Sequence, residues 1–435
     1  MTESMWPAPL ATSPVHGTIG IAGSKSIANR ALLLAALANG SSTLTGLPLA
    51  ARDINLMMTA LRSLGIRFEV DVTNRAVHVF PGPLRGPADI DCGLAGTVMR
   101  FLPPVAALAE GDIRFDGDPR ARERPMAAAI LALGDLGVQL STDNEPRLPF
   151  RIHATGSVSG GSVTVDASSS SQFVSAFLLP GCYFEQGIRI HHRGAPVPSL
   201  PHIEMTCRML QQQGITVTAD TEDPTDANWS IAPGTIAPRD RHIEPDISNS
   251  LPFAAASLIS GGKVELLGWP QAGLQPVSIV RELLSELGGD SVQTDAGLTV
   301  RGTGEINGID RDLSDLGELV PTVVALCALA NGPSRLSGIG HISGHETDRL
   351  SALANELNRI GGDVSVTSDG LEIHPKPLHG GEWHTYNDHR MATAGAIIGL
   401  RVPGIGVENI ATTGKTFPEF PELWQKLVSD SNLVV

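Results

Sequence analysis

The stretch GSKSIANRALLLAALANG, residues 23–40, joins an apolar helix to a strongly polar beginning. Residues 31–38 are all alanine or leucine, which is typical of a helix that is buried on every side. The first half carries Lys25, Ser26 and Arg30. A lysine in the first turn of a helix opposes the helix dipole, so its presence here favours a functional role over a purely structural one.

Helices of this kind recur along the chain, and each precedes a short alternating strand. The other apolar segments are residues 98–109, 173–184, 251–260, 319–330 and 391–400. The strands end about every 70 residues, at the turn residues Gly46, Gly117, Gly194, Gly268, Gly338 and Asn409. A second, amphipathic helix follows, and five of these helices end at the predicted C-cap glycines Gly65, Gly137, Gly214, Gly288 and Gly361. The sequence therefore predicts six repeats, each roughly α-β-α-β-β.

Six repeats group most simply as two domains of three repeats. Residues 232–246, which are rich in proline, glycine and charge, mark the weakest point between the third and fourth repeats. We predict an N-terminal domain of residues 24–242 and a C-terminal domain of residues 1–23 plus 243–435. The strand at residues 16–23 has no partner in the first repeat. We expect it to pair with the last repeat, so that the chain crosses between domains twice.

Composition restricts the classes of partner. The net charge of −15 argues against nucleic acid and against anionic membranes. The four cysteines, Cys92, Cys182, Cys207 and Cys327, lie far apart, which makes a disulfide framework or a structural metal unfavourable. The sequence has no apolar run of about 18 residues and no secretion signal at its start, so a cytoplasmic protein is expected.

Polar residues stand before every buried helix. They include Gly96, Thr97 and Arg100 in the second repeat, Ser170, Ser171 and Gln172 in the third, Asp246, Ser248 and Asn249 in the fourth, Glu318 in the fifth, and residues 388–390 in the sixth. Free N–H groups at helix N-termini attract anions, so six such ends predict a pocket for a highly charged ligand. For the fourth repeat, simple N-capping remains an open alternative.

Three turns that follow strands carry further charged residues. Arg124 lies in the turn at residues 116–125, Lys415 in the turn at 412–421, and Glu346 in the turn at 343–349. Each turn could equally be a solvated loop that leads into a helix. In particular, Ser343 and Glu346 fit a capping box.

Seven motifs in order then resemble the 5-enolpyruvylshikimate-3-phosphate synthase family of enolpyruvyl transferases. They are GSKSIANRALLLAALA, LAGTVMR, DGDPRARERP, SSQF, HETDR, DHRMA and KTFPEFP, and the similarity runs from about residue 14 to 425. The resemblance implies an α/β (α+β) fold of two pseudo-symmetric domains. Each would contain three βαβαββ-type repeats with buried helices, an inside-out α/β barrel. The active site would lie in the cleft between the domains.

The resemblance also implies a reaction, in which the enolpyruvyl group of phosphoenolpyruvate is transferred to the 5-hydroxyl of shikimate 3-phosphate. The reaction passes through a tetrahedral adduct, releases phosphate, and needs no metal or organic cofactor. Both substrates are anionic small molecules, and the enzyme is expected to be a monomer. The N-terminal domain would form the shikimate 3-phosphate side and the C-terminal domain the phosphoenolpyruvate-contacting side.

Site residues follow from the same motifs. Lys25, Glu318 and Glu346 are the implied catalytic residues: Glu318 orients or deprotonates the 5-hydroxyl, and Glu346 protonates the methylene carbon. Shikimate 3-phosphate would be bound by Lys25, Ser26, Arg30, Ser170, Ser171, Gln172, Ser199, Glu318 and His345. Phosphoenolpyruvate would be bound by Lys25, Gly96, Arg124, Gln172, Arg349, His389, Arg390 and Lys415.

The sequence departs from the family pattern at several of these motifs. Leu94, Phe101, His202 and His345 replace the usual Asn, Pro, Tyr and Lys, and Glu318 replaces the usual Asp. Phe101 and Leu94 leave the geometry around Gly96 and the response to glyphosate open. His345 removes one permanent cation, because histidine is charged only near or below pH ~6.5.

Two rival functions remain. One is the sister transferase that acts on a UDP-amino sugar, UDP-N-acetylglucosamine, and carries a cysteine in a mobile loop. The matching loop here, about residues 112–125, has arginines and no cysteine. The other rival is a non-catalytic anion-binding module, which would be expected to lack Lys25, Glu318 or Glu346, whereas all three are present.

Overall fold

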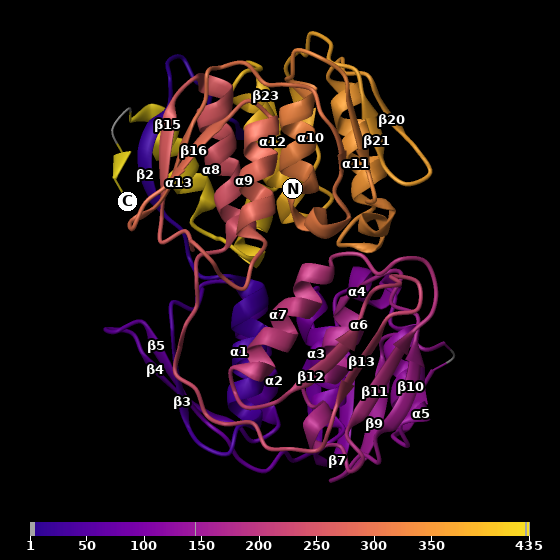
Figure 1. Ribbon diagram of the computed structural model, residues 1–435. Coiled ribbons are helices and arrows are strands. Elements are labelled where there is room, and N and C mark those ends of the chain that lie inside the picture. The colour runs from indigo at the N-terminus through magenta and orange to yellow at the C-terminus, as the bar shows by residue number, and fades with distance from the viewer. Residues whose placement is uncertain (1–4, 144, 431–432, 435) are drawn as a thin grey trace. The chain divides into compact units, whose positions relative to one another are not determined.

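The chain forms two compact units in the computed structural model, which describes residues 5–143, 145–430 and 433–434 (Figure 1). The N-terminal unit is Gly23–Ile243, and the C-terminal unit combines Met1–Ala22 with Glu244–Val435. The domain limits expected from the sequence, 24–242 and 1–23 plus 243–435, lie one residue from these boundaries.

Three sheets build the N-terminal unit. Its strands are β3 Ser42–Thr45, β4 Arg67–Asp71, β5 Ala76–Phe80, β6 Ala88–Asp91, β7 Glu110–Asp116, β8 Gln139–Thr142, β9 Phe150–Thr155, β10 Gly161–Val165, β11 Ile188–His192, β12 Val217–Asp220, β13 Asn228–Ile231 and β14 Arg241–His242. The sheet orders are β14-β3-β5-β4, β6-β7-β9-β8 and β10-β11-β13-β12. In each sheet the first pair is parallel and the other two pairs are antiparallel.

Three further sheets build the C-terminal unit. Its strands are β1 Trp6–Pro7, β2 His16–Gly20, β15 Lys263–Leu267, β16 Asp290–Gln293, β17 Gly297–Arg301, β18 Asp310–Asp312, β19 Ser334–Ser337, β20 Val364–Val366, β21 Leu371–Ile373, β22 Gly381–Trp383, β23 Ile405–Val407 and β24 Leu433–Val434. The sheet orders are β16-β17-β15-β2-β24, β18-β19-β21-β20 and β1-β23-β22.

The two predicted kinds of helix are both confirmed. The buried helices are α1 Lys25–Leu37, α3 Gly96–Ala106, α6 Gln172–Leu178, α8 Ile247–Ser260, α10 Val320–Ala328 and α12 His389–Gly399. The amphipathic helices are α2 Arg52–Ser63, α5 Ala127–Asp135, α7 Leu200–Gln211, α9 Val277–Glu286, α11 Arg349–Arg359 and α13 Phe420–Ser429, and α4 Pro119–Glu123 is an additional short helix. The five predicted C-cap glycines all have left-handed φ values, from 87° to 99°, which side chains other than glycine rarely adopt. Every residue of α3, α10 and α12 is buried, as the apolar pattern predicts.

The strands that precede α1 and α8 are exchanged between the two units. β2 precedes α1 in sequence, but it pairs in parallel with β15, in the sheet of the fourth repeat. β14 precedes α8 but pairs in parallel with β3, in the sheet of the first repeat. The expectation that residues 16–23 pair with the last repeat is therefore wrong for the main partner of β2, although the short β24 lines its other edge. The last repeat is instead completed by β1, which pairs with β23.

The buried helices of each unit are tied together at their C-terminal ends. In the C-terminal unit, Arg401 follows α12 and donates hydrogen bonds to the carbonyl oxygens of Ile259, Leu329 and Gly304. Ile259 lies at the end of α8, and Leu329 caps α10. In the N-terminal unit, Tyr183 follows α6 and donates to the carbonyl of Leu37 at the end of α1. A cation or hydroxyl at these positions satisfies carbonyls that the helices leave unpaired.

Arg401→Met tests this tie, because methionine keeps much of the aliphatic stem and removes the donors. We expect a loss of about 1–2 kcal/mol in the free energy of unfolding, since Arg401 is partly solvated. Thermal denaturation should then show a midpoint about 2–8 °C lower. Arg335→Met is the matched control, because Arg335 is an exposed arginine of β19. Equal midpoints for the two variants would contradict the role of Arg401.

Candidate functional site

Arg349 is the centre of a charged cluster in the C-terminal unit. It is the first residue of α11, and its side chain is fully buried. Its Nε and Nη2 atoms donate to the two carboxylate oxygens of Asp388, at 2.8 and 3.2 Å. Nη2 also donates to Oε2 of Glu346 at 2.9 Å, and Nη1 donates to Nδ1 of His345 at 2.8 Å. Burial disfavours the charged guanidinium, but the surrounding carboxylates outweigh it and raise the pKa of Arg349.

Glu346 does not cap a helix. The helix α11 begins at Arg349, and its N-cap is Asp348, which accepts a hydrogen bond from the backbone N–H of Ser351 at 3.2 Å. Ser343 lies in a 3₁₀ turn, Gly340–Gly344, that ends before His345. The predicted capping box of Ser343 and Glu346 is therefore wrong, because the chain is extended at His345. The Glu346 carboxylate instead accepts hydrogen bonds from Arg349 and Lys415.

Glu318 is the more exposed carboxylate of the cluster, with about a third of its side chain accessible. Its Oε2 atom lies 3.4 Å from Nη1 of Arg349 and 3.7 Å from Nε of Arg390. Burial favours the neutral acid, but the charges of Arg349, His345 and Arg390 hold the pKa of Glu318 well below its usual range. Glu318 is consequently a carboxylate at neutral pH and a weak proton acceptor.

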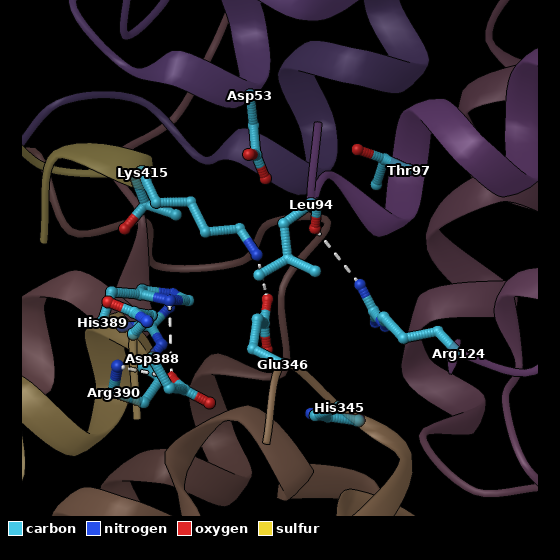
Figure 2. A network of polar contacts seen from close by, with 12 residues as sticks. Asp53, Leu94, Thr97, Arg124, His345, Glu346, Asp388, His389, Arg390 and Lys415 are labelled. Carbon is cyan, nitrogen blue, oxygen red and sulfur yellow. Dashed lines mark hydrogen bonds and ion pairs between the residues drawn. The ribbon is translucent and has the colours of Figure 1, made fainter. Parts of the chain in front are cut away.

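Two further predicted cations complete the cluster. Lys415 donates from Nζ to Glu346, as the dashed line in Figure 2 shows. Arg390 donates from Nη1 to the carbonyl of Ser248 at 3.0 Å and to Oδ1 of Asn249 at 2.9 Å. Both partners of Arg390 lie in the first turn of α8, so the N-terminal ends of α8 and α12 meet here.

His345 is neutral at physiological pH. Burial and the neighbouring Arg349 hold its pKa well below the usual value, against the opposite pull of Glu318 and Glu346. Its Nδ1 accepts a hydrogen bond from Arg349, so the remaining proton lies on Nε2. The departure from lysine thus replaces a cation by an acceptor for Arg349.

Lys25 in the N-terminal unit faces a carboxylate that the sequence reasoning did not single out. It is the first residue of α1, and its Nζ lies 3.2 Å from Oδ2 of Asp53. The Asp53 side chain is 1% exposed and belongs to the first turn of α2. In the sequence, an aspartate in the first turn of a helix is typical of a residue that compensates the helix dipole. Only the burial of Asp53, which the sequence does not show, distinguishes it from such a residue.

Gly96, Arg124 and Gln172 come together, as predicted. A Cβ atom at Gly96 would lie 3.1 Å from Nη2 of Arg124 and 3.2 Å from Oε1 of Gln172. Arg124 also donates to the carbonyl of Leu94 at 3.2 Å (Figure 2). Because Leu94 contributes its backbone, this contact does not need the asparagine that is usual at that position. A side chain at Gly96 would press on the guanidinium of Arg124 and the amide of Gln172, which would have to shift by a few tenths of an ångström.

Arg100 fixes the side chain of Gln172. Its Nη1 donates to Oε1 of Gln172 and to Oγ of Ser170, both at 3.1 Å. Arg100 lies at the fifth position of α3, not in its first turn. The helix dipole therefore gives no reason, as it does for Lys25, to expect a functional role for Arg100. Ser171 is the N-cap residue of α6 and is 4% exposed.

Arg30 is 1% exposed, which the sequence did not indicate. It donates to Oγ1 of Thr206 at 2.7 Å, to the carbonyls of Ser26 and His202 at 2.9 and 3.1 Å, and to Oγ of Ser175 at 3.3 Å. These bonds use four of its five N–H groups. Burial lowers the pKa of Arg30 to about 9, so the guanidinium remains charged at neutral pH.

Phe101 and Ser199 shape the surroundings of Arg30. The fully buried ring of Phe101 lies 4.8 Å from the guanidinium carbon of Arg30, a cation–π distance. Ser199, the N-cap of α7, has left-handed backbone angles of 56° and 44°. Such a conformation costs a non-glycine residue about 1–2 kcal/mol, and residues of this kind concentrate at functional sites.

The predicted site residues therefore fall into groups within each unit. The C-terminal unit brings together Glu318, His345, Glu346, Arg349, Arg390 and Lys415. The N-terminal unit brings together Gly96, Arg124, Ser170 and Gln172, and separately Ser26 with Arg30. His389 is 2% exposed and lies beside Thr413 and Phe417. Asp388, at the heart of the Arg349 cluster, was not among the predicted site residues.

The described residues also answer two general questions. They contain no group of three or more His, Cys, Asp and Glu side chains arranged to hold a metal ion. Over the same residues, none of the helices has the length and apolar character required to cross a bilayer.

Comparisons with known proteins agree on one family. The family model described as EPSP synthase (3-phosphoshikimate 1-carboxyvinyltransferase) matches residues 10–424. A 3-phosphoshikimate 1-carboxyvinyltransferase of Kocuria rhizophila is 50% identical over 442 residues, which covers 98% of this chain and 97% of that protein. A solved EPSP synthase from Acinetobacter baumannii is 25% identical with a TM-score of 0.77, covering 98% and 97% of the two chains. The enolpyruvyl transferase NikO from Streptomyces tendae, at 16% identity and a TM-score of 0.73 over 96% of each chain, shares the fold.

His345→Asn tests the electrostatics of the cluster, since asparagine keeps an acceptor for Arg349 and removes the titrating ring. The native pKa of His345 is depressed, so below its unfolded value of ~6.5 only the unfolded chain takes up the proton. Stability is therefore lost as the pH falls below that value. The carboxylate Glu318, which also has a lowered pKa, loses its contribution only below about pH 4.5.

The measurement is the thermal midpoint at about pH 7.5 and about pH 5.5. The midpoint of the parent should fall more than that of His345→Asn over this range. His341, whose pKa is also lowered by burial, is present in both proteins and cancels in the comparison. Parallel falls in the two proteins would show that His345 takes its proton equally well in the native state.

Proposed function

Because this chain belongs to the EPSP synthase family, we propose that it transfers the enolpyruvyl group of phosphoenolpyruvate to the 5-hydroxyl of shikimate 3-phosphate. The products are 5-enolpyruvylshikimate 3-phosphate and phosphate, so the enzyme serves the shikimate pathway to chorismate and the aromatic amino acids. The observation that carries this proposal is the cluster around Arg349. It places three cations and three carboxylates in contact, including the predicted acid Glu346.

We assign phosphoenolpyruvate to the cations of both units. Arg349, Arg390 and Lys415 supply charge-assisted donors in the C-terminal unit, and Arg124 does so beside Gly96 in the N-terminal unit. Anions with several oxygens suit such donors, because each oxygen accepts more than one hydrogen bond. Lys25, Gln172 and His389 remain in this set as predictions from the motifs.

We assign shikimate 3-phosphate to the N-terminal unit. Its phosphate would be held by Ser26, Ser170 and Ser171, and its ring by Gln172, which Arg100 fixes in place. Arg30 has one N–H left after its four contacts, so it acts mainly by shaping the site around Ser26. Lys25 and Ser199 complete the N-terminal set, and Glu318 and His345 of the C-terminal unit are added to it as predictions from the motifs.

Glu318 serves best as the residue that orients the 5-hydroxyl. A carboxylate whose pKa is held well below its usual range accepts a hydrogen bond readily but takes a proton poorly. The oxygen of the 5-hydroxyl attacks C2 of phosphoenolpyruvate and its proton is released to solvent, while protonated Glu346 delivers a proton to the methylene carbon. Elimination then breaks the bond from C2 to the phosphate oxygen, phosphate leaves, and the Glu346 carboxylate takes a proton back from the new methyl group. When Glu346 gives up its proton it becomes a carboxylate, and the ammonium group of Lys415, which contacts it, would stabilise that negative charge.

We also propose that each unit is an inside-out barrel and that the enzyme is a cytoplasmic monomer that needs no cofactor. Residues 24–242 would form the shikimate 3-phosphate side, and residues 1–23 plus 243–435 the phosphoenolpyruvate-contacting side. The similarity to NikO concerns the fold and favours no second substrate.

The activity is tested by measuring phosphate release from phosphoenolpyruvate with and without shikimate 3-phosphate. We expect release only when both substrates are present, with one 5-enolpyruvylshikimate 3-phosphate formed for each phosphate. Release that does not depend on shikimate 3-phosphate, or that responds to a UDP-amino sugar instead, would overturn the proposal.

Glu346→Gln separates catalysis from electrostatics. Glutamine can still accept the bond from Arg349 but cannot supply a proton, so kcat should fall by ~10²–10⁴. The KM values should change far less than kcat. Glu382→Gln, at an exposed position of β22, is the matched control and should keep full turnover. Turnover of Glu346→Gln within about threefold of the parent would refute the assignment of Glu346 as the acid.

A further inference from the structure

Glu356 is a fully buried carboxylate that no part of the proposed chemistry uses. It lies in α11, two turns after Arg349, so both residues occupy the same face of the helix. Its side chain is 0% exposed. A buried carboxylate is costly unless its oxygens receive several hydrogen bonds, so its partners indicate what it does.

Two of those partners belong to one short segment, and the third is Arg359 of the same helix. Oε2 of Glu356 accepts the backbone N–H of His384 at 2.9 Å, and Oε1 accepts the hydroxyl of Tyr386 at 2.7 Å. Arg359, one turn further along α11, approaches both oxygens at 3.4 Å. Burial and the neighbouring Glu356 raise the pKa of Tyr386 to about 12, so the tyrosine keeps the proton that it donates. A second carboxylate, Glu408, accepts the backbone N–H of Thr385 at 3.3 Å.

The segment held in this way contains two consecutive residues with a left-handed backbone. Tyr386 and Asn387 have φ values of 54° and 56°, which asparagine tolerates but tyrosine rarely adopts. The conformation costs Tyr386 about 1–2 kcal/mol, so it persists only if the surrounding contacts enforce it. The hydrogen bond from its hydroxyl to the Glu356 carboxylate is the contact that holds the side chain of Tyr386.

Asn387 links the same turn to the segment that ends at Lys415. Its carbonyl accepts the hydroxyl of Thr412 at 2.9 Å, and its Oδ1 accepts from the side chain of Asn409 at 2.9 Å. Thr412 lies in the 3₁₀ turn Ile410–Lys415. The strained turn therefore adjoins both the start of α12, which carries the proposed ligand Arg390, and the 3₁₀ turn that carries Lys415.

Asp388 follows this turn directly and passes its geometry to the cluster. It is the N-cap of α12, and its Oδ1 accepts the N–H of Arg390 at 2.8 Å. The same carboxylate holds both Nε and Nη2 of Arg349. Figure 2 shows Asp388, His389 and Arg390 grouped at this point. A relaxed turn would thus displace Asp388, and with it two cations of the proposed phosphoenolpyruvate set.

We propose that Glu356 and Tyr386 form a positioning pair, in which the Glu356 carboxylate locks the strained Tyr386–Asn387 turn and so fixes Asp388, Arg349 and Arg390 for binding phosphoenolpyruvate. The inference rests on the proposed function for its substrate, but the lock itself is a property of the fold. Neither residue belongs to the proposed substrate-binding set, so both are positioning residues and not catalytic ones.

Tyr386→Phe is the primary test, because it removes one hydroxyl and keeps the ring. We expect KM for phosphoenolpyruvate to rise about 5- to 20-fold, less than the ~10- to 150-fold loss when a bond to a charged group is removed outright, because Arg349 and Arg390 would be displaced but still present. KM for shikimate 3-phosphate should stay within about twofold of the parent. Glu356→Gln should produce the same pattern. The double variant should show no more than the larger single effect, since both changes break one contact.

Tyr183→Phe is the matched control. Tyr183 is the other tyrosine of the chain. Its hydroxyl is hydrogen-bonded as well, but to backbone groups, including the carbonyl of Leu37 at the C-terminal end of α1. Its loss should lower the thermal midpoint without changing either KM. A purely structural role for Tyr386 would give the same result as this control and would overturn the proposal.

Hydrogen exchange separates the lock from the activity. Amide exchange in residues 384–390 should be faster in Tyr386→Phe than in the parent, and unchanged in Tyr183→Phe. Unchanged exchange in Tyr386→Phe would overturn the lock, whatever the kinetics show. If the parent releases no phosphate with shikimate 3-phosphate, the proposed function fails, while faster exchange in residues 384–390 would still support the lock.

Discussion

Each of the six central helices is apolar around its whole circumference, and the need to cover that surface organises the rest of the chain. A single sheet covers only one side of a helix. Three helices packed together cover one another inward, and their three sheets cover them outward. In the C-terminal unit α8, α10 and α12 contact each other in this way, as α1, α3 and α6 do in pairs in the N-terminal unit. The requirement explains why three repeats, and not one, form a compact unit.

The same packing concentrates charge at one end of each helix group. Arg390 joins α12 to the first turn of α8, while Arg100 joins α3 to the start of α6. Helix dipoles add at such a point and favour anions. The cations of the site differ in their partners. Arg349 in the C-terminal unit and Lys25 in the N-terminal unit are matched by carboxylates. Arg30 and Arg124 donate instead to hydroxyl and carbonyl oxygens, and Arg30 uses four of its five N–H groups in this way. Arg124 therefore keeps more charge-assisted donors for a substrate anion than Arg30 does.

The departures from the family pattern are absorbed by particular contacts. Leu94 offers a backbone carbonyl to Arg124, so its side chain is not needed for that bond. Phe101 packs its ring against Arg30, and His202 offers its carbonyl to the same guanidinium. His345 accepts a hydrogen bond from Arg349, which a lysine could not do. Each substitution therefore changes the support of an arginine and leaves the arginine in place.

Much of the architecture could be predicted from the sequence because its signals are local. Apolar runs, alternating strands and C-cap glycines depend on a few neighbouring residues, and they located all six repeats and both kinds of helix. The motifs also placed Arg349, Arg390 and Lys415 in one predicted phosphoenolpyruvate-binding set, and predicted Glu346 separately as the acid. Residues that act through burial gave no such signal: Asp53, Asp388 and Glu356 look like ordinary helix-end or surface acids in the printed sequence.

Only the tertiary structure decided which strands pair and which charges meet. The exchange of β2 and β14 between the sheets of the first and fourth repeats joins residues 247 positions apart for β2 and 197 positions apart for β14, and no local pattern encodes such a partner. The helix start at Arg349, by contrast, depends on the local N-cap Asp348, which the capping-box interpretation of Ser343 and Glu346 overlooked. The sequence by itself determined the repeats, the helix types and the chemistry of the site residues, because these follow from local composition and spacing. Burial and long-range contacts determined the pKa directions and the strained turn before Asp388, because desolvation and ion pairing act through space.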